Sequence, residues 1–186
     1  MNWKPLNKHI ANTLVGLVLT TNVAAIDPNS DQAINIESDQ ALLDDAEGIS
    51  SYNGNVIVSQ GLSKLEADRL LVSAKDRRIT RIEAWGSPAH FVQQDDATTA
   101  ATHGYAQSIV FEAKESLLVF TGQARLLQSE NSFAGERIEY DIVKKAIRAQ
   151  GDESIGSRVK IQYFPSPKNK QTNTPSPPKE DANTAP

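Results

Sequence analysis

The 186-residue chain contains no cysteine. That absence excludes a disulfide scaffold, a thiolate zinc site, an iron–sulfur cluster and a thiol nucleophile, all of which need the cysteine sulfur atom. Histidine occurs only three times, and the chain has no G-x-S-x-G, phosphate-loop or H-E-x-x-H motif. The sequence therefore predicts a protein that is not an enzyme and holds no cofactor.

The histidines offer one candidate metal site. His9 lies in a predicted export signal, which leaves His90 and His103, with Asp95 and Asp96 between them. No further ligand stands at a spacing typical of a metal site. We therefore favour a loop over a metal site and expect residues 94–103 to form a long mobile connection.

The chain also has fewer basic than acidic residues. The 19 Lys and Arg are outnumbered by 23 Asp and Glu, which gives a formal net charge of −4. Nucleic-acid affinity depends on neutralising phosphates with Lys and Arg. The chain is therefore not expected to bind nucleic acid.

No apolar run has the length of a typical membrane span. Near the N-terminus, Lys4 and Lys8 precede a short apolar segment, residues 14–19, and small residues follow up to Ala25. This order is typical of an export signal cleaved after that alanine. The uncharged stretch 10–26 is diluted by Asn and Thr and falls short of the ~20 apolar residues of a membrane helix, so an uncleaved anchor is the less favoured interpretation.

The C-terminal end is equally distinct. Residues 165–186 hold six of the nine prolines and few apolar residues, so this tail is expected to be disordered. We divide the chain into a signal peptide (1–25), one folded domain (26–164) and a Pro-rich tail (165–186). Cleavage of the signal removes two of the 19 basic residues and none of the 23 acidic ones, so the exported chain has a net charge of −6.

Within residues 26–164 the dominant hydrophobic period is two. Apolar residues alternate with polar ones around Val56, Leu70, Ile109 and Ile138, and Gly, Asn, Asp and Ser interrupt these runs at short intervals. No segment keeps the helical spacing of apolar residues between good caps. We therefore predict an all-β domain with little helix.

An internal repeat is visible when the sequence is shifted by 68 residues. Residues 36–72 then align with 104–140 without a gap, and Gly54 aligns with Gly122. A finer unit recurs within the repeat, and its copies begin at Asp39, Asp68, Gln107 and Glu136. Such repeats are typical of stacked arrays in which each unit covers the apolar face of its neighbour and strand edges stay open at both ends.

Four segments carry a family resemblance. They are Ile36-Glu37-Ser38-Asp39-Gln40, Gly54-Asn55-Val56-Ile57-Val58-Ser59-Gln60-Gly61, Ala67-Asp68 and Gly86-Ser87-Pro88-Ala89-His90-Phe91. Because of these four segments, residues 26–164 resemble the OstA-like family of periplasmic lipopolysaccharide-transport proteins. The second repeat departs from the pattern, with Gln123, Ala124 and Ser129 at the places of Asn55, Val56 and Gly61.

The resemblance implies an open, twisted β-jelly roll of about sixteen short antiparallel strands built from internal repeats. It also implies a bridge in the periplasm of a Gram-negative bacterium, made of chains joined head to tail between an inner-membrane transporter complex and an outer-membrane translocon. The acyl chains of lipid A would lie in a groove between two sheets, so that lipopolysaccharide passes from the inner to the outer membrane. Joints would form by β-augmentation at strands around 34–43 and 159–164.

The alternation predicts which residues line this groove. The exported chain and lipopolysaccharide are both anionic, so burial of acyl chains, worth about 0.8 kcal/mol per CH₂, must supply most of the affinity. An ordinary place in the core is the alternative for each residue. The predicted lipid-binding residues are Ile34, Ile36, Val56, Val58, Leu70, Val72, Phe91, Ile109, Phe111, Leu126, Ile138 and Tyr140.

A basic cluster is a second candidate for lipid contact, through phosphate groups that Arg binds in bidentate pairs. Its members are Lys75, Arg77, Arg78 and Arg81. Asp76 interrupts the cluster, and residues 144–148 hold a comparable basic group in the second repeat. Interruption and recurrence favour a structural turn.

Two other functions remain open. One is a membrane-anchored relative in the same transport system, which would keep Met1. The other is a structural β-repeat module that binds protein partners through its edge strands and carries no lipid.

Overall fold

The computed structural model describes residues 32–94 and 100–165. Strands dominate these ranges, and their one helix is the 3₁₀ turn Glu153–Ile155, which confirms the all-β prediction. The predicted signal peptide (1–25) and all but the first residue of the predicted tail (165–186) lie outside the described residues. Within the described part of the chain, no helix is long and apolar enough to cross a membrane.

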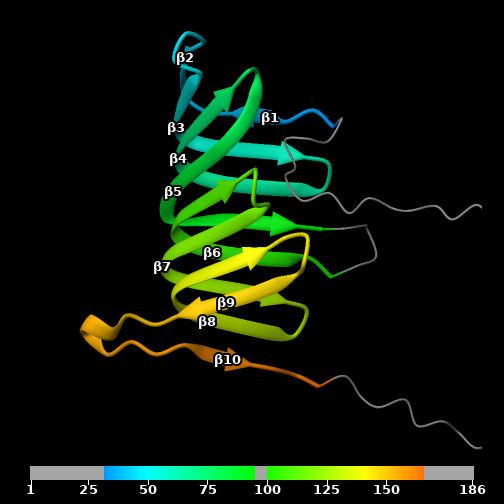
Figure 1. Cartoon of the computed structure of the whole chain (residues 1–186), viewed down its shortest axis with the longest axis vertical. Helices are drawn as coiled ribbons and strands as arrows, with labels where there is room; N and C mark the ends of the chain where they lie inside the picture. The colour runs from blue at the N-terminus through cyan, green and yellow to red at the C-terminus, as the bar shows by residue number, and fades with distance from the viewer. Residues whose placement is uncertain (1–31, 95–99, 166–186) are drawn as a thin grey trace, which may run out of the picture.

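Ten strands pair into one open antiparallel sheet (Figure 1). They are β1 (Asn35–Glu37), β2 (Gln40–Asp44), β3 (Ile49–Gln60), β4 (Ser63–Lys75), β5 (Arg78–Gln93), β6 (Thr102–Glu112), β7 (Leu117–Gln128), β8 (Asn131–Asp141), β9 (Ala146–Gln150) and β10 (Lys160–Gln162). The long strands β3 to β8 form a meander. Two short strands complete each edge: β1 and β2 pair with different halves of β3, and β10 and β9 pair with different halves of β8.

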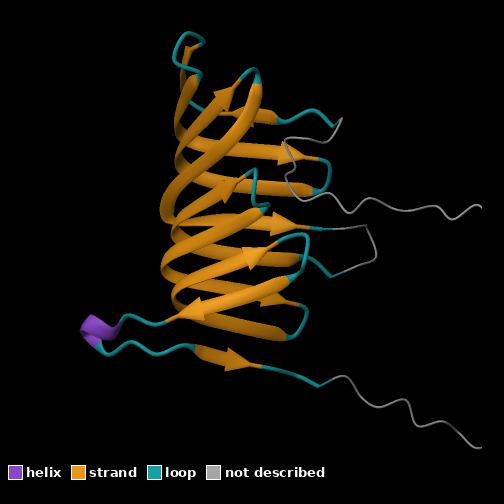
Figure 2. Cartoon of the chain, in the orientation of Figure 1, coloured by secondary structure: helices purple, strands orange, loops and turns teal. Residues whose placement is uncertain are grey.

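Bulges near the middle of the long strands divide the sheet into two walls. The pairing register shifts between Asn53 and Val56 in β3 and between Thr121 and Ala124 in β7, with comparable shifts between them. Bulges bend a strand, and Figure 2 shows the long strands bending along the left side of the view. Wall A consists of residues 35–37, 56–60, 63–67, 89–93, 102–106, 124–128, 131–135 and 160–162. Wall B consists of residues 40–44, 49–53, 69–75, 78–85, 108–112, 117–121, 137–141 and 146–150.

Left-handed backbone at two glycines makes two of these bends. Gly54 and Gly122 have φ of +80° and +84°, values that glycine adopts without the steric penalty of a Cβ atom. The side chain of Asp39 lies over Gly54 and accepts a hydrogen bond of 2.9 Å from Asn55 Nδ2. Strands β3 and β7 begin and end 68 residues apart, which is the offset of the sequence repeat.

The inner faces of the two walls pack against each other. The rings of Phe91 on wall A and Phe120 on wall B have centroids 6.3 Å apart. Gly104 on wall A lies against the Phe120 ring, in a place where a Cβ atom would overlap it. Apart from Val119, the buried apolar side chains of the described residues form one cluster that draws on both walls.

The strand count corrects the expectation of about sixteen short strands in a jelly roll. The described residues form ten strands in one sheet, and β5 alone has 16 residues. A bulge bends a strand without ending its ladder, so the two alternating runs beside a bulge belong to one strand. The expected pair of sheets is therefore the pair of walls of a single bent sheet.

Gly104→Ala is expected to destabilise the fold. The added methyl group overlaps the fully buried Phe120 ring, and overpacking of this kind costs about 1–3 kcal/mol in free energy of unfolding, measurable by urea denaturation. In the double variant Gly104→Ala/Phe120→Leu the smaller side chain relieves the overlap, so the two costs are expected not to add. Additive costs would contradict direct packing of the walls at this point.

Candidate functional site

The facing surfaces of walls A and B form the candidate site, because they gather the predicted lipid-binding residues. Ile34 and Ile36 are partly buried and pack against the core cluster, and the other ten residues belong to it. Wall A supplies Val56, Val58, Phe91 and Leu126, and wall B supplies Leu70, Val72, Ile109, Phe111, Ile138 and Tyr140. The structure thus brings all twelve to one interior.

The bulges keep apolar side chains on the inner face of both walls. In β4 the buried apolar position on wall A, Leu65, has an odd number, whereas those on wall B, Leu70 and Val72, have even numbers. The change from odd to even occurs at the bulge. A one-residue slip turns every later side chain to the opposite face. In β7 the positions in the core cluster keep even numbers from Leu118 to Leu126, because two residues, not one, separate the two segments that pair with β8.

The two walls are in contact in this structure. One small apolar cavity between them has a volume of about 10 Å³, roughly the room that one water molecule needs. Its lining residues come from both walls or follow them: Leu65, Ile82, Phe91, Ile109, Phe111, Leu118 and Ile142. A cavity of this size has no room for a ligand as large as an acyl chain, so the apolar side chains around it contact each other.

The sequence prediction omits eight buried residues of the core cluster. Four of them are alanines, and the four larger ones are Leu65, Ile82, Leu118 and Phe120. Leu118 and Phe120 lie in an apolar run with Leu117 and Val119, so no polar residue marks the alternation there. The aligned repeat holds the missing signal, since Phe120 stands at the place of Tyr52, which also packs against the cluster.

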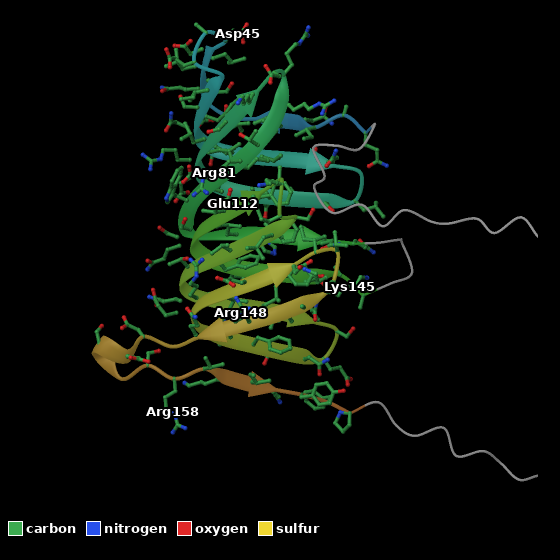
Figure 3. All side chains as sticks on the ribbon, viewed as in Figure 1. Asp45, Arg81, Glu112, Lys145, Arg148 and Arg158 are labelled. Atoms are coloured by element: carbon green, nitrogen blue, oxygen red, sulfur yellow. The ribbon has the colours of Figure 1, made fainter. Side chains whose placement is uncertain are left out.

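The outer face of wall B carries ion pairs. Arg81 pairs with Glu112 on the neighbouring strand, as Figure 3 shows. Arg137 and Arg148 both pair with Glu139, at 3.1 and 2.9 Å. Pairs this exposed contribute little to stability, but they neutralise charges on the outer surface.

The predicted basic cluster is split by the fold. Lys75, Arg77 and Arg78 are exposed around the β4–β5 turn, where Asp76 and Arg77 have φ of 53° and 63°. This agrees with the favoured interpretation as a structural turn. Arg81 is different, because it lies inside β5 with its guanidinium directed to Glu112.

The two histidines lie on strands, because β6 begins at Thr102 and so shortens the expected connection over residues 94–103 by two residues, while residues 95–99 lie outside the described residues. His90 of β5 and His103 of β6 meet on the outer face of wall A, with Nε2 and Nδ1 3.2 Å apart. The other ring nitrogen of His90 lies 3.2 Å from Glu66 Oε2. Among the described residues no group of three or more His, Cys, Asp or Glu is placed to hold a metal ion, and Asp95 and Asp96 lie outside them.

Comparison with known proteins identifies the family. The profile described as LptA/(LptD N-terminal domain) LPS transport protein matches residues 35–146, from β1 to the first residue of β9. The chain belongs to this family. This confirms the resemblance to the OstA-like lipopolysaccharide-transport proteins.

Named relatives of this LptA-family chain are similar to it in sequence over most of their length. The lipopolysaccharide export system protein LptA of Escherichia coli (strain K12) is 32% identical over 176 residues, which cover 92% of each chain. The lipopolysaccharide export system protein LptH of Pseudomonas aeruginosa is 31% identical over 150 residues, 78% of this chain and 86% of LptH.

A solved structure matches the fold of the LptA-family domain. It is described as LptH, the LptA homologous periplasmic component of the conserved lipopolysaccharide transport device from Pseudomonas aeruginosa. It aligns with a TM-score of 0.66 and 27% sequence identity, over 72% of this chain and 96% of that one.

The carboxyl group of Glu66, on the outer face of the LptA-family domain, has a shifted pKa. A hydrogen bond from Lys64 Nζ to Glu66, 2.6 Å long, lowers the pKa of Glu66 below its ordinary 4.5. Partial burial opposes this shift, and His90 adds to it. Because the folded-state pKa is lowered, the resulting stabilisation is present above pH 4.5 and is lost as pH falls through the folded-state value.

Lys64→Met is expected to raise the pKa of Glu66 toward 4.5, because it removes the largest cause of the shift. The side-chain carboxyl resonance of Glu66, followed by NMR between pH 2 and pH 7, measures the change. Lys114→Met is the matched control, since it removes the same charge from an exposed turn. Equal midpoints in the two variants would contradict the assignment of the shift to Lys64.

Proposed function

We propose that this LptA-family chain is a non-enzymatic carrier in the periplasm of a Gram-negative bacterium. It binds lipopolysaccharide through the acyl chains of lipid A and passes it from the inner to the outer membrane for outer-membrane assembly. The main support is the interior between walls A and B, where the twelve predicted residues present one continuous apolar surface. Family membership and relatives named as lipopolysaccharide export proteins favour the same substrate.

The contact between the walls suggests how such a carrier releases its cargo. Burying acyl chains contributes about 0.8 kcal/mol per CH₂, but opening the walls first removes contacts such as Phe91 against Phe120. The net affinity is the difference between these two terms. A carrier whose walls close again after the lipid leaves can pass its cargo on without any chemical step, with energy supplied by a separate ATPase.

Charge plays a smaller part in this proposal. The chain has a formal net charge of −4, and the signal cleavage that we propose makes it −6, so the whole molecule repels an anionic lipid. Three arginines of wall B, Arg81, Arg137 and Arg148, are engaged by Glu112 and Glu139. Recognition of lipopolysaccharide therefore relies on its acyl chains.

The two sheet edges are the proposed joints with partners. One edge consists of β1 and β2, where Leu42 is 71% exposed and Leu43 is 61% exposed. The other consists of β9 and β10, with Ile161 61% exposed on β10. Edge strands that pair on one side only and carry exposed apolar side chains suit β-augmentation. We propose that they join chains head to tail and link the bridge to the inner-membrane transporter complex and the outer-membrane translocon.

Photocrosslinkers at Ile36 and Phe111 are expected to capture lipopolysaccharide in cells, because both positions face the interior between the walls. Crosslinkers at Arg137 and Glu139 on the outer face serve as matched controls and are expected to capture little. Immunoblots with an antibody against lipopolysaccharide provide the readout. Capture from the outer positions alone would rule out the interior as the binding site.

Leu42→Glu is expected to weaken self-association, since it places a charge on the exposed apolar edge of β2. Sedimentation velocity over a concentration series measures the effect. Val143→Glu is the control, because Val143 is similarly exposed, at 76%, but lies in the β8–β9 turn. An equal effect of the two substitutions would argue against an edge-to-edge joint.

Two measurements separate the proposal from its alternatives. Native mass spectrometry of protein purified from a cell envelope is expected to find bound glycolipid, whereas a purely structural β-repeat module carries none. N-terminal sequencing is expected to start at Ile26, whereas a membrane-anchored relative keeps Met1.

A further inference from the structure

A second concave site lies outside the sheet, at the bulges of β5, β6 and β7. This concavity, which is open to solvent on one side, has a volume of about 830 Å³, within the ~300–1,000 Å³ typical of ligand sites. None of its lining residues belongs to the core cluster between the walls. Whatever this outer site binds is therefore a different ligand, or a different part of a ligand, from the one buried between the walls.

Three neighbouring bulges build the outer site. The ladders skip residues 86–88 in β5, residue 107 in β6 and residues 122–123 in β7. β6 lies between the other two strands in the sheet, so Ser87 and Pro88 bound the site from one side and Gln123 bounds it from the other. Backbone groups at bulges are released from the strand ladder, and bulges are common beside functional sites.

The polar side chains of the outer site combine donors with acceptors. Gln107 and Gln123 are exposed and present amides, and Tyr105 and Ser87 present hydroxyl groups. Each of these groups both donates and accepts hydrogen bonds. The Tyr105 ring stacks on His90 with a centroid distance of 4.3 Å and an interplanar angle of 3°, which holds it in place.

One cation stands at the outer site. Arg125 is exposed, and within residues 32–94 and 100–165 no ion pair is found for it. Glu136 is not part of the lining; its carboxylate accepts a hydrogen bond of 3.4 Å from the backbone N–H of Gln123. Pro88 and Leu127 add apolar surface. The site thus joins one positive charge to a set of neutral polar groups.

We propose that this outer site binds an acidic saccharide. Amides and hydroxyl groups match the hydroxyl groups of a sugar, which also donate and accept, and Pro88 and Leu127 suit the C–H faces of the ring. Arg125 pairs with a carboxylate or phosphate on the sugar. An apolar ligand would leave the polar groups unpaired, and a polyanion would need more than one cation.

Two sources supply this chemistry: the oligosaccharide of lipopolysaccharide and the glycan fragments of peptidoglycan. The test titrates the ¹⁵N-labelled full chain with delipidated oligosaccharide from lipopolysaccharide, with soluble peptidoglycan fragments and with a neutral maltooligosaccharide, followed by NMR. Shifts at Tyr105, Gln107 and Gln123 with either acidic probe support the proposal and identify the source. Absence of shifts with both acidic probes, shifts elsewhere only, or equal binding of the neutral probe would overturn it.

Variants of the cation sharpen the test. Arg125→Gln is expected to weaken binding of the acidic probe about tenfold or more, because a charged hydrogen bond is lost. Arg125→Lys is expected to have an intermediate effect, since it keeps the charge without the planar fork. Arg78→Gln removes the same charge from an exposed turn and is expected to change nothing. Equal affinities of Arg125→Gln and Arg78→Gln would contradict the role of Arg125.

The outer site and the carrier function can fail separately. Arg125 lies outside the core cluster, so Arg125→Gln is expected to keep the capture of lipopolysaccharide at Phe111. Loss of capture at Phe111 in Arg125→Gln would contradict two independent sites. Absence of capture in the unmodified chain, with saccharide binding intact, would overturn the carrier function alone.

Discussion

The long strands bend where their ladders slip, and this bend holds the two walls face to face. The left-handed backbone at Gly54 and Gly122 lets the chain turn, and the side chain of Asp39 covers the first of these bends. Without the bend, the apolar face of the meander would be open to water. Because the bend folds the sheet onto itself, each wall buries the apolar side chains of the other.

The contact between the walls also limits what the interior can hold. Phe120 touches the backbone at Gly104 and lies next to Phe91, so the interior is filled by its own side chains. Protein interiors packed in this way have little free volume. In the proposed carrier, lipid binding and wall closure are alternatives, and the balance between them sets how readily cargo moves on.

Bulges have a second consequence on the outer face of the sheet. The inward bend removes residues 86–88 and 122–123 from the ladders and leaves a polar concave surface with Arg125 beside it. Elsewhere on this face, charged groups such as Arg137 and Glu139 pair with each other. The same local irregularity therefore produces an apolar interior and a polar outer site on opposite sides of one sheet.

Much of this arrangement is visible in the sequence because strand side chains alternate with a period of two. The alternation predicts the all-β class and twelve residues that lie in or against the core cluster, and the repeat offset of 68 residues equals the offset between β3 and β7. It does not predict the strand number, because a bulge joins two runs into one strand. The change from odd-numbered to even-numbered apolar positions between Leu65 and Leu70 is a visible sign of such a bulge.

Roles that depend on contacts between different strands leave no local pattern in the sequence. Phe120 lies in a run without polar residues, and His103 pairs across strands with His90, so neither role leaves a periodic signal. Local alternation and motifs are enough to predict the class of fold, the family and the inward face. Contact between the walls and the polar site behind them become visible only in the folded chain, because both depend on how far each bulge bends its strand.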